Sequence, residues 1–216
     1  MPSNYTLLIG LSAIWVLACR GITRFSPGRF QRLLNVWLIA AAVIELTAIG
    51  LIMMHHRNVI MYNLWWPTEF SLLVVLGQAL HPWNRKWLVG FLVTFGAVWI
   101  WDVFSIDPFY RAATRSMIIG ELMISAYYLW QFWMIANTWQ GRLRDSPGAW
   151  LCLAVLVHAG PAGPLLGSYN YFGKIDLDLA HRIFHVNQIF CIAKFILMGV
   201  LCFKMNVVSA AVRNGT

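Results

Sequence analysis

The sequence predicts an all-α integral membrane protein, a bundle of seven transmembrane helices forming one domain over residues 1–216. Of its residues, 60% are hydrophobic and only 11% are charged, which is outside the range of soluble domains. Short charged or Gly- and Pro-containing breaks separate apolar runs, most of them close to the length that crosses a bilayer. Lys and Arg are concentrated in alternate breaks, as expected for loops on the cytoplasmic side of a membrane.

No positively charged segment precedes the first apolar run, and the sequence offers no convincing small-residue cleavage site. We therefore expect a retained helix rather than a removable signal peptide. Six further runs follow at similar intervals. The predicted spans are residues 5–19, 34–54, 60–80, 87–101, 111–137, 149–166 and 180–203. The first and fourth are short for a full crossing, so a six-helix bundle that lacks one of them is the alternative.

The sixth run contains Pro161 and Pro164 within a Gly- and Ala-rich stretch. Each proline removes a backbone donor and frees the carbonyl four residues earlier. A broken helix at membrane depth usually lines a wet or protein-filled cavity. The sequence therefore predicts either an outward-facing pocket at these prolines or an early end of the helix at the membrane interface.

Orientation follows from the basic residues in the short loops. Ten Lys and Arg residues fall on one side and five on the other, which also holds Asp102, Asp107, Asp176 and Asp178. This predicts an outside N-terminus, a cytoplasmic C-terminus and a multi-pass position in the plasma (inner) membrane. The net charge of +8 is explained by these loops, and we expect no nucleic-acid partner. The basic residues of the richer side are Arg20, Arg24, Arg29, Arg32, Arg85, Lys86, Arg142, Arg144, Lys204 and Arg213.

Lys194 lies within the last span, about 20 Å from its outer start at 1.5 Å per residue. A lone ammonium at this depth is costly, so a carboxylate from another helix should meet it. Glu69 and Glu121 lie about 14–15 Å below the outer surface, and Glu45 lies near the middle of the second span. Glu69 is the closest in depth to Lys194 and is the expected partner.

These residues predict a polar pocket in the outer half of the bundle that binds a small ligand or ion. The chain would then act as a receptor or sensor, or as a carrier, and a sensor would need a signalling partner protein. A buried ion pair that only fixes the register of the helices is the structural alternative. The candidate pocket residues are Glu69, Lys194, Glu121, Glu45, Asn187 and His158.

His181 and His185 are four residues apart on the last span, the spacing with which two imidazoles bind one zinc ion. The string HRIFHV that contains them resembles the last helix of the superfamily of adipoQ and progestin receptors and alkaline ceramidases. That resemblance implies a zinc site with His55 or His56 as the third ligand. It also implies that Glu69 assists a metal-bound water that hydrolyses lipid amides. Whether the protein is an enzyme stays open.

Two other cofactors are alternatives. A lysine in the seventh helix facing a carboxylate in the third is similar to the arrangement in microbial rhodopsins, which implies retinal as a Schiff base on Lys194. His55, His158 and His185 lie on different helices and could ligate a haem axially. The four cysteines lack metal-binding spacing, so we interpret them as small buried residues.

Overall fold

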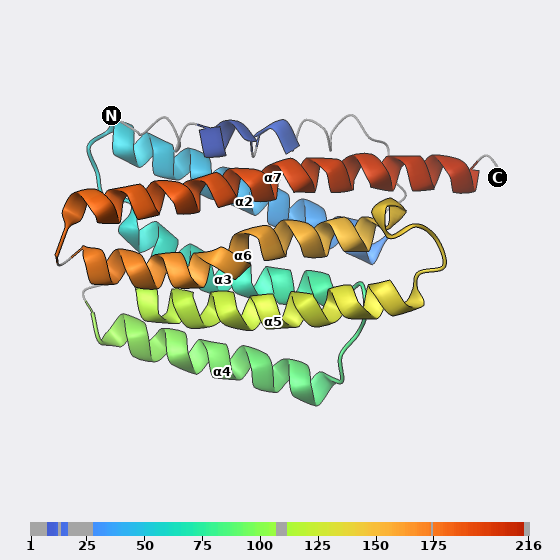
Figure 1. Cartoon of the computed structure of the whole chain (residues 1–216), viewed down its shortest axis with the longest axis horizontal. Helices are drawn as coiled ribbons and strands as arrows, with labels where there is room; N and C mark the ends of the chain where they lie inside the picture. Colours follow the sequence, from blue (N-terminus) through green and yellow to red (C-terminus); the bar gives the residue numbers. More distant parts are fainter. Residues whose placement is uncertain (1–7, 13, 17–27, 107–111, 174, 214–216) are drawn as a thin grey trace.

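The computed structural model describes residues 8–12, 14–16, 28–106, 112–173 and 175–213, and helices form all of the regular secondary structure in these ranges. Long helices run alternately in opposite directions along the molecule (Figure 1). They are α2 (Arg29–Met53), α3 (Val59–Gln78), α4 (Arg85–Phe104), α5 (Thr114–Thr138), α6 (Pro147–Phe172) and α7 (Leu177–Arg213), with a short 3₁₀ helix η1 (Leu143–Asp145) before α6.

Five of these helices, α2, α3, α4, α6 and α7, are long and apolar enough to cross a membrane. The chain is thus an all-helical protein with several candidate membrane spans. Helix α5 has 25 residues but is not among the five. Of the first expected span, only residues 8–12 and 14–16 are described, and these are helical. Cys19, which ends the first predicted span, and Arg20 and Arg24 of the basic loop that follows it lie outside the described residues.

The described part of the first helix packs on the bundle. Ile9 and Val16 are buried. A Cβ atom at Gly10 would lie 2.6 Å from the Cδ1 atom of Ile49 on α2, so glycine permits the close approach of the two helices. On its other side, Trp15 lies against Gly199 of α7.

Local sequence signals explain where several helices begin. Ser146 caps α6 by accepting a hydrogen bond from the backbone N–H of Ala149 at 3.3 Å, and Pro147 occupies the first turn, where no donor is needed. Asn84 caps α4 through the N–H of Lys86 at 2.9 Å. At the start of α5 the cap comes from another helix, because the carboxylate of Asp102 in α4 accepts the N–H of Ser116 at 2.8 Å. Asp102 is therefore buried rather than a loop acid.

Helix α6 continues through Pro161 and Pro164 to Phe172, so the expectation that it ends early at these prolines is wrong. The physical reason is its surroundings. Helix α6 packs along α5 on one side and α7 on the other, and these contacts are the most extensive among helices α2 to α7 as described. Packing against two helices stabilises the helical path on both sides of the prolines, where local propensity would favour a break.

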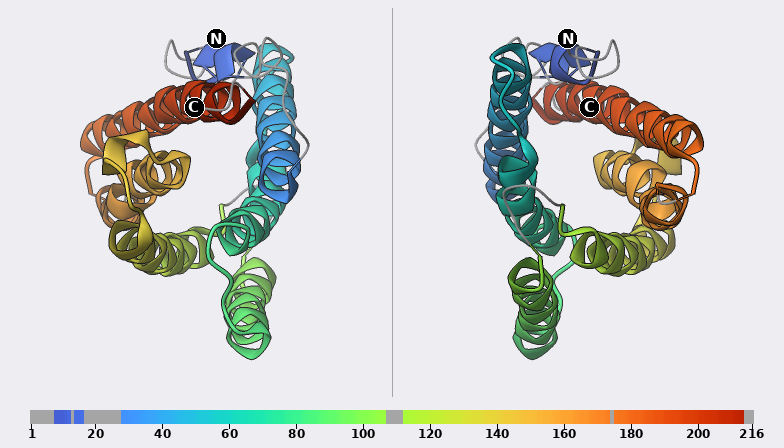
Figure 2. Two further views of the ribbon diagram at one scale, coloured as in Figure 1. Left: turned by 90° about the vertical axis from the view of Figure 1, so that its right-hand side faces the viewer. Right: turned by 90° about the vertical axis from the view of Figure 1, so that its left-hand side faces the viewer.

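Seen from its ends, the bundle consists of an arc of α5, α6 and α7 facing the pair α2 and α3 (Figure 2). Helix α4 lies outside this arrangement and contacts α3 and α5. Its buried residues are Phe95 and Asp102. The site described below therefore lies among α2, α3, α5, α6 and α7, while α4 is peripheral.

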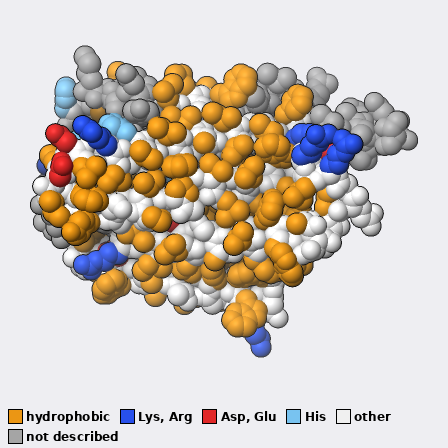
Figure 3. Space-filling model, in the orientation of Figure 1, with side chains coloured by type: hydrophobic (Ala, Val, Ile, Leu, Met, Phe, Trp, Pro, Cys, Tyr) orange, Lys and Arg blue, Asp and Glu red, His pale blue; other side chains and the backbone are white. Residues whose placement is uncertain are grey.

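Hydrophobic side chains cover the middle of the face shown in Figure 3, and Lys and Arg lie toward both ends. We call the end where α2, α4 and α6 begin and α3, α5 and α7 end the basic end, because the basic residues of the richer side lie there: Arg29, Arg32, Arg85, Lys86, Arg142, Arg144 and Lys204. At this end, Lys204 Nζ lies 3.0 Å from Asp145 Oδ1. The hydrogen bond and charge of Lys204 lower the pKa of the Asp145 carboxyl below its usual value.

Candidate functional site

The structure brings Lys194 and Glu69 together. Lys194 Nζ on α7 donates a hydrogen bond to Glu69 Oε1 on α3 at 3.0 Å. Both residues are buried, with 5% and 6% of their surfaces exposed. An ammonium and a carboxylate at this burial each lose several kcal/mol of hydration, and direct hydrogen bonding offsets part of that loss. The pair therefore joins two helices that are far apart in sequence.

Aromatic rings surround the ammonium. Lys194 Nζ lies 5.6 Å from the centroid of the Trp37 ring on α2 and 5.4 Å from that of Phe195 on its own helix. The two rings stack, with centroids 6.1 Å apart. The negative faces of such rings attract a cation. Lys194 is thus held by one carboxylate and two rings, deep within the bundle.

A second carboxylate, Glu45 on α2, lies near the same ammonium. Glu45 Oε2 accepts a hydrogen bond from the hydroxyl of Tyr62 on α3 at 3.3 Å. Glu45 also interacts electrostatically with both Lys194 and Glu69. One lysine therefore faces at least two acids from neighbouring helices.

The third carboxylate, Glu121 on α5, lies beside a histidine of α6. Glu121 Oε1 is 3.7 Å from Nδ1 of His158, and Glu121 is 4% exposed. Both Glu121 and His158 interact electrostatically with Lys194. We call Glu45, Glu69, Glu121, His158 and Lys194 the acid-rich cluster, to which each of α2, α3, α5, α6 and α7 contributes one residue.

The acid-rich cluster contains more acids than bases. Three carboxylates face one ammonium, so two negative charges are uncompensated when His158 is neutral, and one is uncompensated when it is protonated. Uncompensated charge in an apolar interior costs several kcal/mol per group. The cluster must therefore hold additional positive charge, either as protons on its own groups or as bound cations.

Asn187, also predicted to belong to the pocket, lies on α7 seven residues before Lys194. Its side-chain oxygen is buried and has no hydrogen-bond partner within the described part of the chain. Sequence reasoning missed Tyr62 and Cys191, although their positions gave a signal. Tyr62 precedes Glu69 by two helical turns, and Cys191 precedes Lys194 by one. The thiol of Cys191 interacts electrostatically with Lys194 and the three carboxylates.

The structure does not bring the predicted zinc ligands, His181, His185 and His55 or His56, together around one point. In the described ranges, which include His55, His56, His181 and His185, no three His, Cys, Asp or Glu side chains are grouped so that they could hold a metal ion. His55 instead terminates α2: it has a φ of 60°, and the N–H of His56 bonds to the carbonyl of Leu51 at 2.8 Å. His185 Nδ1 lies 3.1 Å from Gln188 Oε1 of the same helix. His181 is exposed.

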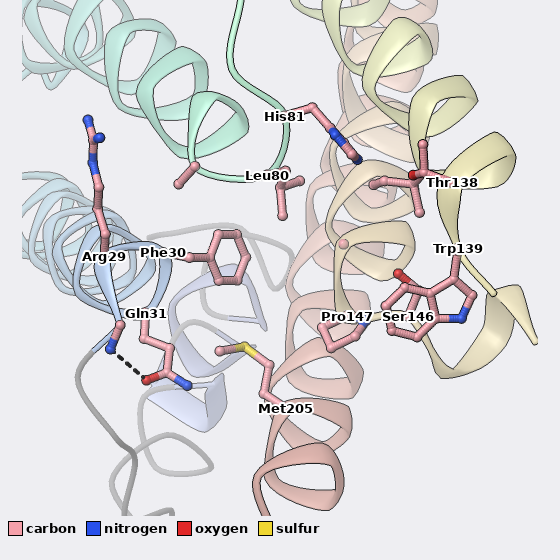
Figure 4. A pocket seen from close by; sticks show the side chains of 14 residues that line it. Arg29, Phe30, Gln31, Leu80, His81, Thr138, Trp139, Ser146, Pro147 and Met205 are labelled. Carbon is pink, nitrogen blue, oxygen red and sulfur yellow. Dashed lines mark hydrogen bonds between the residues drawn. The ribbon is translucent and has the colours of Figure 1, made fainter. Parts of the chain in front are cut away.

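A cavity of about 640 Å³ lies at the basic end, away from the outward-facing position expected from the prolines. Residues at or just beyond the ends of α2, α3, α5 and α6 line it together with Met205 of α7. Phe30, Leu80 and Met205 are apolar lining side chains, and His81, Thr138 and Ser146 are polar ones (Figure 4). Its volume is that of a small-molecule site. A second hollow of about 380 Å³ is lined by Trp83, Asn84, Trp87 and Trp130.

Comparison with known proteins assigns no family: no protein-family model, curated protein or solved structure matches the chain. The geometry of the acid-rich cluster, in five helices of a bundle with candidate membrane spans, is therefore the basis for a functional conclusion.

Proposed function

We propose that the chain is a multi-pass plasma-membrane protein, either a carrier or a receptor-like sensor, that binds a small ion or ligand at the acid-rich cluster. The surplus of carboxylates around Lys194 carries this proposal. A purely structural ion pair needs one acid and one base, as Glu69 and Lys194 provide. Glu45 and Glu121 are additional, and both interact electrostatically with the same ammonium.

The proton is the ligand that the geometry favours. A metal ion requires several ligands converging on one point. The described residues contain no such group of three ionisable ligands. A proton needs only one carboxyl or imidazole, and either Glu121 or His158, whose Oε1 and Nδ1 atoms are 3.7 Å apart, can carry it. Ionisable side chains inside membrane bundles commonly form proton relays in pumps and transporters.

The position of the cluster also supports a binding role over that of an ion pair that only holds helices together. Its residues come from five helices, so a change in its charge acts on several helix contacts at once. Losing or gaining one proton would alter the balance between the Glu69 and Glu121 contacts. A charge change that biases the packing of helices is the basis of pH-driven switches. This is the property that a proton-coupled carrier and a proton sensor share.

The experiment is infrared difference spectroscopy on the purified protein in nanodiscs, which reads the carbonyl stretch of proton-bearing carboxyl groups. The wild type should show such a band at neutral pH, and Glu45→Gln and Glu121→Gln should each reduce it. Asp145→Asn is the matched control, because Asp145 is paired with Lys204 at the surface and should leave the band unchanged.

Sodium and potassium are the competing ligands in this experiment. A band that responds to added sodium or potassium at constant pH would identify a metal cation as the ligand. Complete absence of a proton-bearing carboxyl, together with no response to pH, sodium or potassium, would reduce the cluster to a structural ion pair and overturn the proposal.

A further inference from the structure

The polar residues of α5 form one continuous stripe. Glu121, Ser125, Tyr128 and Gln131 succeed one another at intervals of three or four residues, so they lie on one face of the helix. The exposed surface of α5 is apolar, as at Leu122 (54%), Leu129 (61%) and Trp133 (59%). These polar residues also accord with α5 not being among the five helices apolar enough to span a membrane.

The stripe begins in the acid-rich cluster and ends at the cavity of the basic end. Glu121 belongs to the cluster. Gln131 is fully buried, and its Nε2 donates to the carbonyl of His81 at 3.0 Å and to the Tyr127 hydroxyl at 2.9 Å. His81 lines the cavity, and so does Ile135, one turn of α5 beyond Gln131. The distance along α5 from Glu121 to Gln131 is about 15 Å.

Two groups on the stripe have unmet hydrogen-bonding capacity. The hydroxyl of Ser125 and the side-chain oxygen of Gln131 are buried without a hydrogen-bond partner among the described residues. Between them, the Tyr128 hydroxyl donates to the carbonyl of Leu73 at 2.8 Å and keeps its acceptor positions. Buried polar atoms without protein partners are usually satisfied by internal water.

The spacing of the stripe suits bridging water. Neighbouring polar residues are about 4.5–6 Å apart along the helix axis. One water molecule that makes two hydrogen bonds of about 2.8 Å spans this separation. Water between successive residues would thus connect Glu121 to the cavity through groups that can both donate and accept.

We propose that the polar stripe of α5 and the cavity at the basic end form the route by which protons pass between water at that end and Glu121. The inference rests on the proposed function, since it assigns the access path of the same cluster. A proton from water at the cavity is passed along the stripe to the Glu121 carboxylate, and it returns by the same path. The groups that interact with Glu121 are Glu69 on α3, His158 on α6, and Cys191 and Lys194 on α7.

Cysteine accessibility tests the route without depending on proton binding. In a variant lacking the four native cysteines, Ser125→Cys and Ile135→Cys are introduced singly, with Ala126→Cys and Trp133→Cys as controls on the exposed face of α5, away from the stripe. A charged, membrane-impermeant methanethiosulfonate is added to the basic end of the protein in oriented vesicles. We expect labelling at positions 125 and 135 and none at 126 and 133.

Labelling at position 135 without labelling at position 125 would end the water-filled region at the cavity and overturn the route. Equal labelling of both faces would do the same, because it would show general exposure of α5. Far-UV circular dichroism and elution as a single species establish that each variant is folded.

A second measurement links the route to the cluster. After a pH step at the basic end of oriented vesicles, the carboxyl band of the wild type should respond, and Ser125→Leu should abolish the rapid response. The same variant at equilibrium in nanodiscs should keep the band, because Glu121 is still present. A rapid wild-type response that Ser125→Leu leaves intact overturns the route, whereas a missing band in the wild type overturns the proposed function.

Discussion

The acid-rich cluster differs from a second polar region, which lies closer to the basic end. We call Tyr127 and Tyr128 of α5, with the α3 carbonyls that they contact, the tyrosine layer. The Tyr127 hydroxyl donates to the carbonyl of Val74 at 3.2 Å, and the Tyr128 hydroxyl donates to that of Leu73 at 2.8 Å. Each hydroxyl has its own neutral acceptor, so this layer leaves no charge to balance.

The comparison separates polar groups that hold helices together from polar groups that bind something. In the tyrosine layer, removing one hydroxyl costs one neutral hydrogen bond and leaves the rest of the layer intact. In the cluster, Lys194 interacts electrostatically with all four other members, so removing its charge changes the environment of each of them. We therefore expect effects of different size and different dependence on pH and salt in the two regions.

The largest effect is expected for the ion pair. Glu69→Gln and Lys194→Met should each lower the free energy of unfolding by about 3–5 kcal/mol, because each leaves the other charge buried without its partner. The double variant should lose less than either single variant. Denaturant unfolding in detergent micelles measures all three, and additive losses would show that the two residues do not interact.

The next effect concerns the close approach of α3 and α5 in the tyrosine layer. A Cβ atom at Gly77 would lie 2.5 Å from Cε1 of Tyr127, so Gly77→Ala should destabilise by about 1–3 kcal/mol. Gly96→Ala is the matched control, because no atom lies within 4 Å of a Cβ atom at that position of α4. A loss of the same size at Gly96 would assign the effect to glycine itself rather than to the contact.

A smaller effect is expected for the hydroxyl of Tyr128. Tyr128→Phe removes one neutral hydrogen bond to α3, which should cost about 1 kcal/mol and should not vary with pH near neutrality. Tyr171→Phe, at a tyrosine that is 63% exposed, should change nothing measurable. Thermal unfolding at several pH values tests both, and a loss at Tyr128 that varies with pH near neutrality would contradict a purely neutral contact.

The smallest effect is expected at the surface pair of Asp145 and Lys204. Because the pKa of Asp145 is lowered in the folded protein, its contribution to stability is present above the ordinary pKa of an aspartate. That contribution is lost as the pH falls through the lowered value. Asp145→Asn should remove this acid dependence, and added salt should weaken it in the wild type. Acid titrations of stability at low and high salt measure the difference.

The contrast between the two regions also shows what the sequence could predict. The contact of Glu69 with Lys194 follows from depth in the helices, because oppositely charged residues inside apolar spans have few alternatives to pairing. The contacts of Tyr127 and Tyr128 have no such signal, since their acceptors are backbone carbonyls that every residue provides. Pairing of Glu121 with His158 depends on how α5 and α6 are rotated, which sequence periodicity does not determine.

Other expectations failed for local physical reasons. Pro161 and Pro164 do not end α6, because packing against its neighbours outweighs the loss of backbone hydrogen bonds. His55 closes the turn after α2 in a left-handed conformation, which the spacing of histidines could not indicate. The cavity at the basic end depends on how five helices meet, and no single segment encodes it. The resemblance to zinc-dependent receptors and hydrolases stays a prediction, and the described His, Cys, Asp and Glu residues include no group of three that could hold a metal ion.

The charge balance of the acid-rich cluster is the basis of the proposed function, and Lys194→Met tests that balance directly. With the ammonium removed, Glu69 loses its compensating charge, and the cluster must take up one further cation. The infrared band of proton-bearing carboxyls at neutral pH should therefore increase in Lys194→Met and return to the wild-type intensity when Glu69→Gln is added. A band of unchanged intensity in the folded Lys194→Met variant would contradict the account.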